Sequence, residues 1–236
     1  MAVSLLLGGC GKAQTPKTTN VPQGKPEPAA VSYEELLAGY EELVDYRLWD
    51  TFETDWNDGK TLPVNDTLRK AFEGTEAEWS NMVVDMTDGL DTPDKGDFGY
   101  ITKDLNGDDT PELLWVRRDR TLLAIFTTVD GNPKLLDAFW PRYQGVITDD
   151  GGLFSRSSGG VFIRYDLQQL TPEGDLSTVH TFGIDSGSAE SGPAYYEIVD
   201  NQTVNVDEAH FEILLAENPF TFGAGWMDVP ITFLNP

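Results

Sequence analysis

The chain has little of what commonly builds a catalytic centre or cross-links a small fold. It has one cysteine and two histidines among 236 residues. A single thiol cannot form an internal disulfide, so the fold has to be held without one. The histidines, His180 and His210, are too few for the usual zinc ligand sets, and we expect each to be an ordinary surface or core residue. The sequence also lacks a Gly-x-Ser-x-Gly nucleophile motif.

Positive charge and long apolar runs are scarce as well. The chain has 16 Lys and Arg against 40 Asp and Glu, which gives a net charge of −24. A field this negative repels nucleic acid and anionic lipid, and it attracts divalent cations. No run approaches the ~18 apolar residues that a membrane-spanning helix needs. We therefore expect no nucleic-acid partner, and any membrane attachment has to come from a lipid anchor.

The N-terminal residues are typical of a bacterial lipoprotein signal. The apolar run 2–7 is followed by Gly8-Gly9 and then by Cys10, the only cysteine. An apolar core and small residues before a cysteine are features of that signal, although Met1-Ala2-Val3 contains no Lys or Arg. We expect residues 1–9 to be removed and Cys10 to be lipidated. This predicts an extracytoplasmic protein anchored to the outer face of the cell membrane.

Residues 10–30 differ in composition from the rest of the chain. They are rich in Pro, Thr and Lys, and they contain no aromatic side chain. Such a stretch cannot bury enough surface to offset the entropy cost of ordering, so we expect a flexible linker. Residues 31–236 hold all the aromatic side chains and the acidic excess. We expect them to form a single α+β domain.

Apolar residues at helical spacing lie at both ends of this domain. Two of the predicted helices begin with capping-box patterns, Ser32–Glu35 and Thr75–Glu78. The last predicted helix opens at Asn205–Glu208 and ends at Asn218-Pro219. The predicted helices cover residues 33–48, about 67–72, a stretch that starts at 75, and 205–218.

Short β-branched and aromatic runs, separated by turn residues, fill the middle of the chain. Asp130–Pro133 is typical of a hairpin turn, and Thr171–Gly174 forms a second turn. The spacings are too short for parallel crossovers, so we expect antiparallel pairing. The predicted strands are Phe98–Lys103, Glu112–Arg117, Leu122–Val129, Lys134–Trp140, Tyr143–Thr148, Val161–Leu170, Leu176–Ile184, Ala194–Val199 and Ile231–Leu234. The predicted fold class is α+β, with N-terminal helices, an antiparallel β-meander of about 7-9 strands and one late helix.

The segment 104–112 places oxygen-bearing side chains on alternate residues between two predicted strands. Calcium prefers six to eight hard oxygen ligands, which loops supply in this pattern. Asp109 stands where such loops usually have glycine, and Trp115 where an EF-hand has its bidentate glutamate. The alternative is a tight turn at Asn106-Gly107 whose acidic side chains face water. We expect a structural calcium held by side chains at loop positions 1, 3, 5 and 9 and by the carbonyl at 7: Asp104, Asn106, Asp108, Glu112 and Thr110.

The run Tyr100–Trp115, YITKDLNGDDTPELLW, together with the later β-runs and the helix that contains Asp207–Phe211, resembles uncharacterised secreted lipoproteins of gut Firmicutes. Those proteins commonly carry a D-x-N-G-D-G-x-P-E-L motif after an N-terminal helix. The loop is also similar to those of dockerins, EF-hands and FG-GAP-type surface proteins, but its flanks are predicted strands. The resemblance covers residues 32–216 loosely, and only the loop is specific. It implies a surface location and a calcium-type loop, and it implies no activity.

The remaining signal for ligand binding is a set of six tryptophans whose rings can stack on sugars or peptides: Trp49, Trp56, Trp79, Trp115, Trp140 and Trp226. Trp79 and Trp115 fit the core periodicity, whereas Trp56 and Trp226 are expected to be exposed. The leading hypothesis is a non-enzymatic surface lipoprotein, a calcium-stabilised module that binds an extracellular or cell-envelope ligand. The alternative is a secreted calcium-dependent hydrolase that acts on glycans or peptides, and a cleft with two carboxyl groups would favour it. A structural or assembly module is a third hypothesis.

Overall fold

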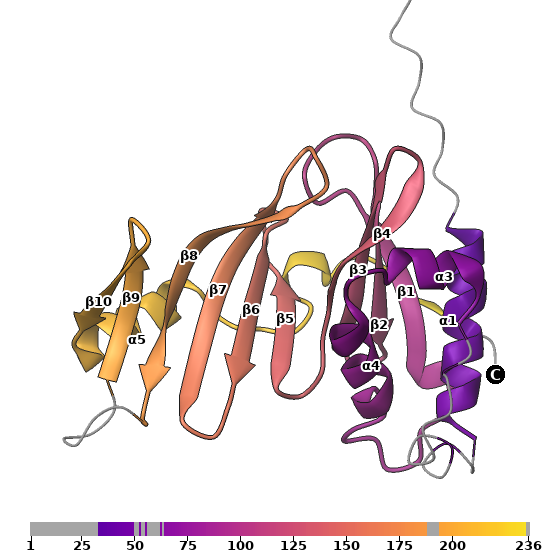
Figure 1. Cartoon of the computed structure of the whole chain (residues 1–236), viewed down its shortest axis with the longest axis horizontal. Coiled ribbons are helices and arrows are strands. Elements are labelled where there is room, and N and C mark those ends of the chain that lie inside the picture. Colours follow the sequence, from indigo (N-terminus) through magenta and orange to yellow (C-terminus); the bar gives the residue numbers. More distant parts are fainter. Residues whose placement is uncertain are drawn as a thin grey trace, which may run out of the picture.

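Two antiparallel sheets form the body of the domain, and helices cover an outer face of each (Figure 1). The computed structural model describes residues 33–49, 52, 55, 62, 64–187 and 194–234. Within them, the first sheet has the strand order β11-β1-β2-β3-β4, and the second has the order β10-β9-β8-β7-β6-β5. The edge strands β4 and β5 are consecutive in the sequence, so the chain crosses from one sheet to the other through the turn between them.

The first sheet pairs four consecutive strands with a short C-terminal one. Glu112 begins β2, directly after the loop that follows β1, and Gly99 of β1 pairs with Phe233 of β11. The strands are β1 (Phe98–Lys103), β2 (Glu112–Arg117), β3 (Leu122–Val129), β4 (Asn132–Ala138) and β11 (Thr232–Phe233). Asp130 and Gly131, in the turn between β3 and β4, have φ angles of 51° and 76°. Two left-handed residues in succession are what a type I′ hairpin requires.

The second sheet is a six-stranded meander. Its strands are β5 (Tyr143–Ile147), β6 (Leu153–Ser158), β7 (Phe162–Leu170), β8 (Leu176–Asp185), β9 (Ala194–Val199) and β10 (Gln202–Val206). Cross-strand partners share a face, and one such row joins Tyr143, Ser157, Arg164, Gly183 and Tyr196 across β5 to β9.

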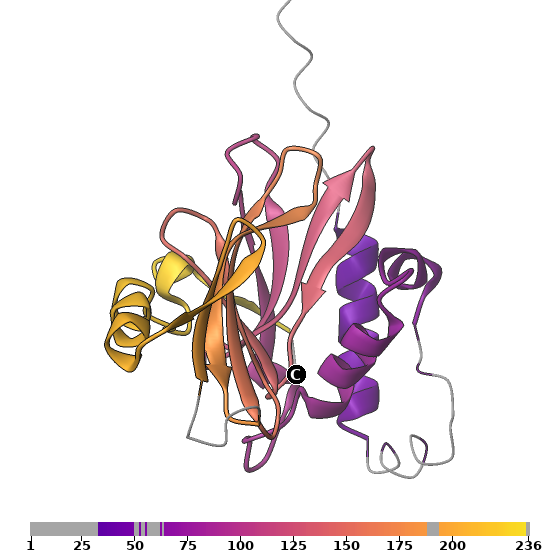
Figure 2. The same ribbon diagram turned by 60° about the vertical axis from the view of Figure 1, so that its left-hand side comes forward.

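Helices α1 (Glu34–Arg47), α3 (Asp66–Ala71) and α4 (Glu76–Asp85) pack on the first sheet, and α5 (Glu208–Glu217) packs on the second. Figure 2 shows α5 on the opposite side of the sheets from the N-terminal helices. Two short 3-10 turns, η1 (Lys95–Asp97) and η2 (Ala224–Trp226), complete the described elements. None of the helices in the described ranges has both the length and the apolar character that crossing a bilayer requires.

The first sheet is buried on both faces, which explains its uninterrupted apolar strands. Along β2, Leu113 and Trp115 belong to a core shared with the N-terminal helices, whereas Leu114 and Val116 belong to a second core shared with β5 and β6. Side chains alternate between the two faces of a strand, so a strand covered on both sides needs apolar residues at successive positions. A third core joins the second sheet to Phe211 of α5.

The structure confirms the predicted α+β class, and it also shows what the sequence pattern did not reveal. The predicted strands 98–103, 112–117, 122–129 and 194–199 match the observed ones. Strands β6 and β10 were not predicted, and the expected single meander is divided between two sheets. The sequence GGLFSRSSGG, which contains β6, has glycine pairs on both sides and therefore resembles a loop.

Two local predictions are wrong. Thr75 makes no side-chain cap on α4, because its hydroxyl donates backward to the carbonyl of Phe72 at 2.9 Å. Trp226 was expected to be exposed, yet it is fully buried, with the Arg120 guanidinium 4.9 Å from its ring centre. The late helix is present as predicted, but its cap is Asp207, which accepts a hydrogen bond from the His210 amide at 2.8 Å, and Asn205 and Val206 before it belong to β10. Ser32 lies outside the described residues.

Candidate functional site

The predicted calcium loop connects β1 to β2 and is closed by its own side chains. The Asp104 carboxylate accepts hydrogen bonds from the amides of Gly107 at 2.7 Å and Asp109 at 3.1 Å. Asp109 has a φ of 68°, so it adopts the left-handed conformation that such loops usually assign to glycine. The loop therefore has the bend that the sequence predicts.

The middle of the loop continues this pattern. Asn106 accepts a hydrogen bond from the Asp108 amide at 3.1 Å, and Asp108 accepts one from the Thr110 amide at 2.7 Å. Each carboxylate oxygen has more than one lone pair, so these bonds leave capacity for a cation. The side chains of Asp104, Asn106 and Asp108 are at least partly exposed.

Glu112 differs from the other predicted ligands because it is fully buried. Its carboxylate accepts hydrogen bonds from the Leu105 amide and the Thr127 hydroxyl, both at 2.9 Å. Burial raises the pKa of Glu112, and these two hydrogen bonds only partly oppose the effect. Among the described residues, no three Asp, Glu, His or Cys side chains are close enough together to hold a metal ion. The loop fits calcium only in part, since the Glu112 carboxylate is buried and already bonded to Leu105 and Thr127, whereas the other predicted side-chain ligands are at least partly exposed.

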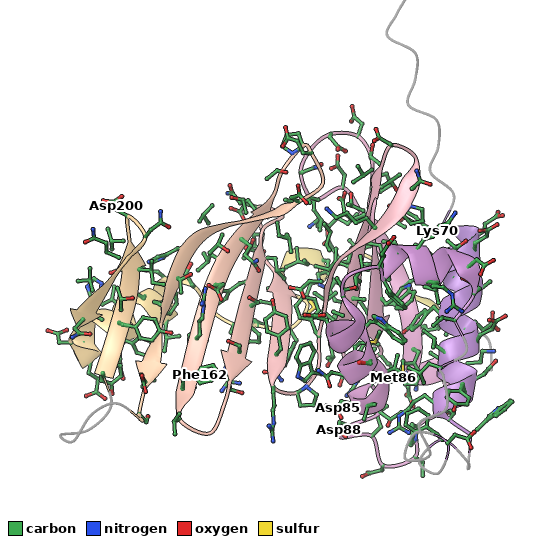
Figure 3. The ribbon with its side chains drawn as sticks, viewed as in Figure 1. Lys70, Asp85, Met86, Asp88, Phe162 and Asp200 are labelled. Carbon is green, nitrogen blue, oxygen red and sulfur yellow. The ribbon has the colours of Figure 1, made fainter. Side chains whose placement is uncertain are left out.

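A second candidate site lies where α4 and β4 meet the second sheet. We call it the Trp140 groove; it is an open hollow of about 480 Å3 lined by Glu78, Asp137, Trp140, Arg142, Tyr143, Ser157, Ser158 and Phe162. In Figure 3, Phe162 lies at the lower end of β7, and Met86 and Asp88 lie near the lower end of α4, on either side of this region. The groove is therefore bounded by two layers of the fold.

The backbone turn 140–143 holds the centre of the groove. The amides of Trp140 and Tyr143 each donate to the carbonyl of the other residue at 2.8 Å. Their rings are 5.2 Å apart, and Tyr143 also stacks on Phe139 at 5.4 Å. Only Pro141 and Arg142 lie between the paired residues, so the two rings are fixed by a tight turn.

Asp137 is the most perturbed carboxyl group in the groove. Burial raises its pKa to about 6, and the charge of Glu78 acts in the same direction, while hydrogen bonds from the Tyr143 hydroxyl and the Ala138 amide oppose them. The Tyr143 hydroxyl donates to Asp137 at 2.6 Å. Burial and the Asp137 charge also raise the pKa of Tyr143. The groove thus contains a carboxyl group that titrates close to physiological pH.

A separate hollow of about 330 Å3 lies on the other side of Trp140 and is lined in part by Met86, Leu123, Phe139 and Arg117. The Arg117 guanidinium donates to the Asp88 carbonyl at 2.7 Å and pairs with Asp119 at 2.5 Å. These contacts tie the turn after α4 to the first sheet. Trp140 thus lines both hollows, each of which mixes apolar and charged side chains.

The two histidines, each expected to be an ordinary surface or core residue, both contact a single carboxylate. Nε2 of His180 is 2.8 Å from one oxygen of Glu197, and Nε2 of His210 is 3.1 Å from the other. Burial acts to raise the pKa of Glu197, but the hydrogen bonds and charges of the two imidazoles outweigh it, so the pKa is lowered. This cluster ties the first turn of α5 to β8 and β9.

The structure does not bring all the predicted functional residues together. Cys10 and Trp56 lie outside the described residues, and the loop 104–112 is a separate feature from the Trp140 groove. The sequence analysis missed Asp137 and Tyr143 and named Trp140 only as one of six tryptophans; the one further signal was Trp140-Pro-Arg-Tyr143, two aromatics separated by two turn residues. Comparisons of the chain with protein-family models, curated proteins and solved structures give no match.

Proposed function

We propose that the chain is a lipid-anchored, extracytoplasmic binding module that holds a structural calcium at 104–112 and its ligand in the Trp140 groove. The groove carries the binding function, because its aromatic and polar lining is fixed before any ligand arrives. Hollows that combine aromatic side chains with a few fixed polar groups are the usual form of small-ligand sites.

Fluorine NMR tests whether the groove binds anything. Protein labelled with 5-fluorotryptophan reports on each tryptophan, and a Trp140→Phe variant assigns the resonance of Trp140. We expect members of a chemically mixed fragment library to shift the Trp140 resonance while that of Trp49, which is 63% exposed, stays unchanged. A library that leaves the Trp140 resonance in place would contradict the binding function.

The calcium proposal rests on the oxygens of Asp104, Asn106 and Asp108 and on the carbonyl of Thr110. Calcium at ~100 times its dissociation constant adds about 2.7 kcal/mol to the free energy of unfolding. We expect Asp104→Ala to lower the melting temperature when calcium is supplied and to have much less effect in a chelator. An equal loss under both conditions would show ordinary turn damage without a metal.

The anchor proposal rests on the sequence of residues 1–10. Mass spectrometry of the protein taken from its native membrane should find Cys10 as the first residue, carrying a thioether-linked lipid. A Cys10→Ser variant should leave the membrane fraction. Recovery of the wild-type chain with Met1 intact and no acyl group would contradict this part of the proposal alone.

The hydrolase alternative is favoured by one observation, the pair Asp137 and Glu78 in the same groove. A carboxyl group with a pKa of about 6 near a second carboxyl is suited to general acid–base catalysis. If the protein is a hydrolase, it should release new reducing ends or amines from oligosaccharides or peptides, and Asp137→Asn should abolish this release. Binding without turnover supports the non-enzymatic proposal.

A further inference from the structure

The lining of the Trp140 groove combines ring faces with hydrogen-bonding groups of both kinds. Trp140 is half-buried, and Phe162, which also lines the hollow, is 43% exposed. Aromatic rings present large, rigid apolar faces that a flat ligand can cover. Two such faces in one hollow favour a ligand that is itself partly apolar and extended.

The polar groups in the groove offer donors and acceptors in similar numbers. Glu78 and Asp137 accept hydrogen bonds, the Arg142 guanidinium donates them, and the hydroxyl groups of Ser157 and Ser158 do both. Among the described residues, Glu78 and Arg142 form no ion pair within 4 Å, and the Arg142 charge acts on Asp85 only from a longer distance. These groups are therefore available to a ligand that replaces water around them.

We infer that the ligand of the Trp140 groove is a neutral saccharide that places a ring face on Trp140 and its hydroxyl groups against Glu78, Asp137 and Arg142. This inference rests on the proposed binding function. A sugar hydroxyl donates to a carboxylate and accepts from a guanidinium, so one ligand satisfies both kinds of group. An apolar ligand would instead leave buried polar groups without partners, which is costly.

Charge disfavours the other ligand classes. An anion has to approach two carboxylates on a chain with a net charge of −24. A cation makes no use of the Arg142 guanidinium, whose positive charge repels it. The neutral saccharide is the class that matches the whole lining.

The surface next to the groove indicates that the saccharide is longer than one unit. The cross-strand row that starts at Tyr143 continues through Ser157 and Arg164 to Tyr196. The Arg164 guanidinium is held in place by three hydrogen bonds to the Asp166 carboxylate at 2.8 to 3.0 Å. Four inter-strand steps span ~19 Å, so this polar row extends well beyond the groove.

The test titrates the full-length chain with cellohexaose, maltohexaose and chitohexaose, and separately with hexagalacturonate and spermidine as anionic and cationic probes. Affinity is measured by calorimetry, and occupancy is followed by the fluorine resonance of Trp140. We expect at least one neutral hexasaccharide to bind, with a loss of about tenfold or more in affinity for Trp140→Ala. Phe162→Ala, at an exposed position that carries little risk to folding, should weaken binding about threefold. Trp49→Ala, outside the groove, is the matched control and should leave affinity unchanged.

The failures of the two proposals are distinguishable. If spermidine or library fragments shift the Trp140 resonance and no neutral hexasaccharide binds, the saccharide assignment is wrong and the binding function stands. If hexasaccharide binding is insensitive to both Trp140→Ala and Phe162→Ala, the sugar binds elsewhere and the assignment to the groove is overturned. If no probe shifts Trp140, both proposals fail.

Discussion

The two sheets obey the same alternation rule but differ in what covers them. β2 is buried from Glu112 to Val116, because helices lie on one side of it and the second sheet on the other. In β10, at the far edge of the second sheet, four of the five residues are exposed. Stability therefore concentrates in the first sheet, while open polar surface is found on the second. The Trp140 groove lies at the boundary, where the covered first sheet with α4 meets an uncovered face of the second sheet.

The sharpest test of this comparison is a pair of alanine substitutions, one in each sheet. Trp115 is fully buried, stacks on Tyr40 with ring centres 4.2 Å apart and contacts Phe126 at 4.5 Å. We expect Trp115→Ala to lower the free energy of unfolding by about 4 kcal/mol, because it removes a large core side chain. Val204 of β10 is 45% exposed, and Val204→Ala should change the free energy by less than about 0.5 kcal/mol.

Urea denaturation measures both variants. If Trp115→Ala does not fold, Trp115→Phe gives a smaller loss in the same direction. Similar losses for Trp115→Phe and Val204→Ala would show that the two sheets contribute equally to stability.

The next largest effect is expected at Glu112, the one charged side chain buried in the first sheet. Glu112→Ala leaves the Leu105 amide and the Thr127 hydroxyl without their acceptor, so we expect a loss of about 3 kcal/mol in the free energy of unfolding. Glu112→Gln keeps the shape and one acceptor oxygen and should cost less. If both variants behave alike in a chelator but differ in calcium, Glu112 acts as a metal ligand and not as an anchor of β2.

Much of the fold could be predicted because its signals are local. The composition of Leu122–Val129 predicts the strand that is observed. Asp130-Gly131 predicts a hairpin turn and forms one. Asp207 caps the helix that follows it. β10 was missed because it directly precedes that cap, and its last two residues, Asn205 and Val206, were assigned to the helix start. The exposure of a tryptophan depends on tertiary contacts and not on its neighbours in the sequence. Trp226 is buried because η2 packs against β5.

The candidate groove could not be predicted, because sheet register and not sequence distance brings its residues together. Asp137 and Tyr143 meet through a tight turn, but Glu78 comes from α4 and Ser157 from β6. The same is true of His180, Glu197 and His210, which come from three different elements. The spacing of Asp104, Asn106 and Asp108 did predict the bent loop. It could not show that the Glu112 side chain is buried.

A pH titration tests the boundary between the sheets. The pKa of Asp137 in the folded chain is about 6, above its ordinary value of 3.8, so the folded state binds this proton more tightly than the unfolded state. The contribution of Asp137 to stability should therefore fall as the pH rises from about 4 to about 6. Asp137→Asn removes this contribution, and its stability relative to wild type should rise by about 2 kcal/mol across that window. Asp149→Asn, at an exposed turn, controls for the loss of one negative charge. If its stability changes with pH in the same way as that of Asp137→Asn, the pH dependence does not come from the buried Asp137 carboxyl group.

The smallest effect is expected at Glu197, in the loosely covered part of the second sheet. Its pKa in the folded chain lies below the ordinary value of 4.5, so the stability that the carboxylate contributes is present above that pH and is lost as the pH falls through the folded value. Glu197→Gln should cost less than about 1 kcal/mol at pH 7, and this difference from wild type should shrink in acid.

Hydrogen exchange locates the Glu197 effect. Because His210 lies in the first turn of α5, Glu197→Gln should speed exchange of the α5 amides and leave the β2 amides unchanged. His210→Gln removes only one of the two imidazole contacts and should produce part of the same local change. If Glu197→Gln instead speeds exchange throughout the first sheet, α5 and the outer strands unfold together with the core. In that case the proposed contrast is wrong, because the outer edge of the second sheet does not open independently of the first sheet.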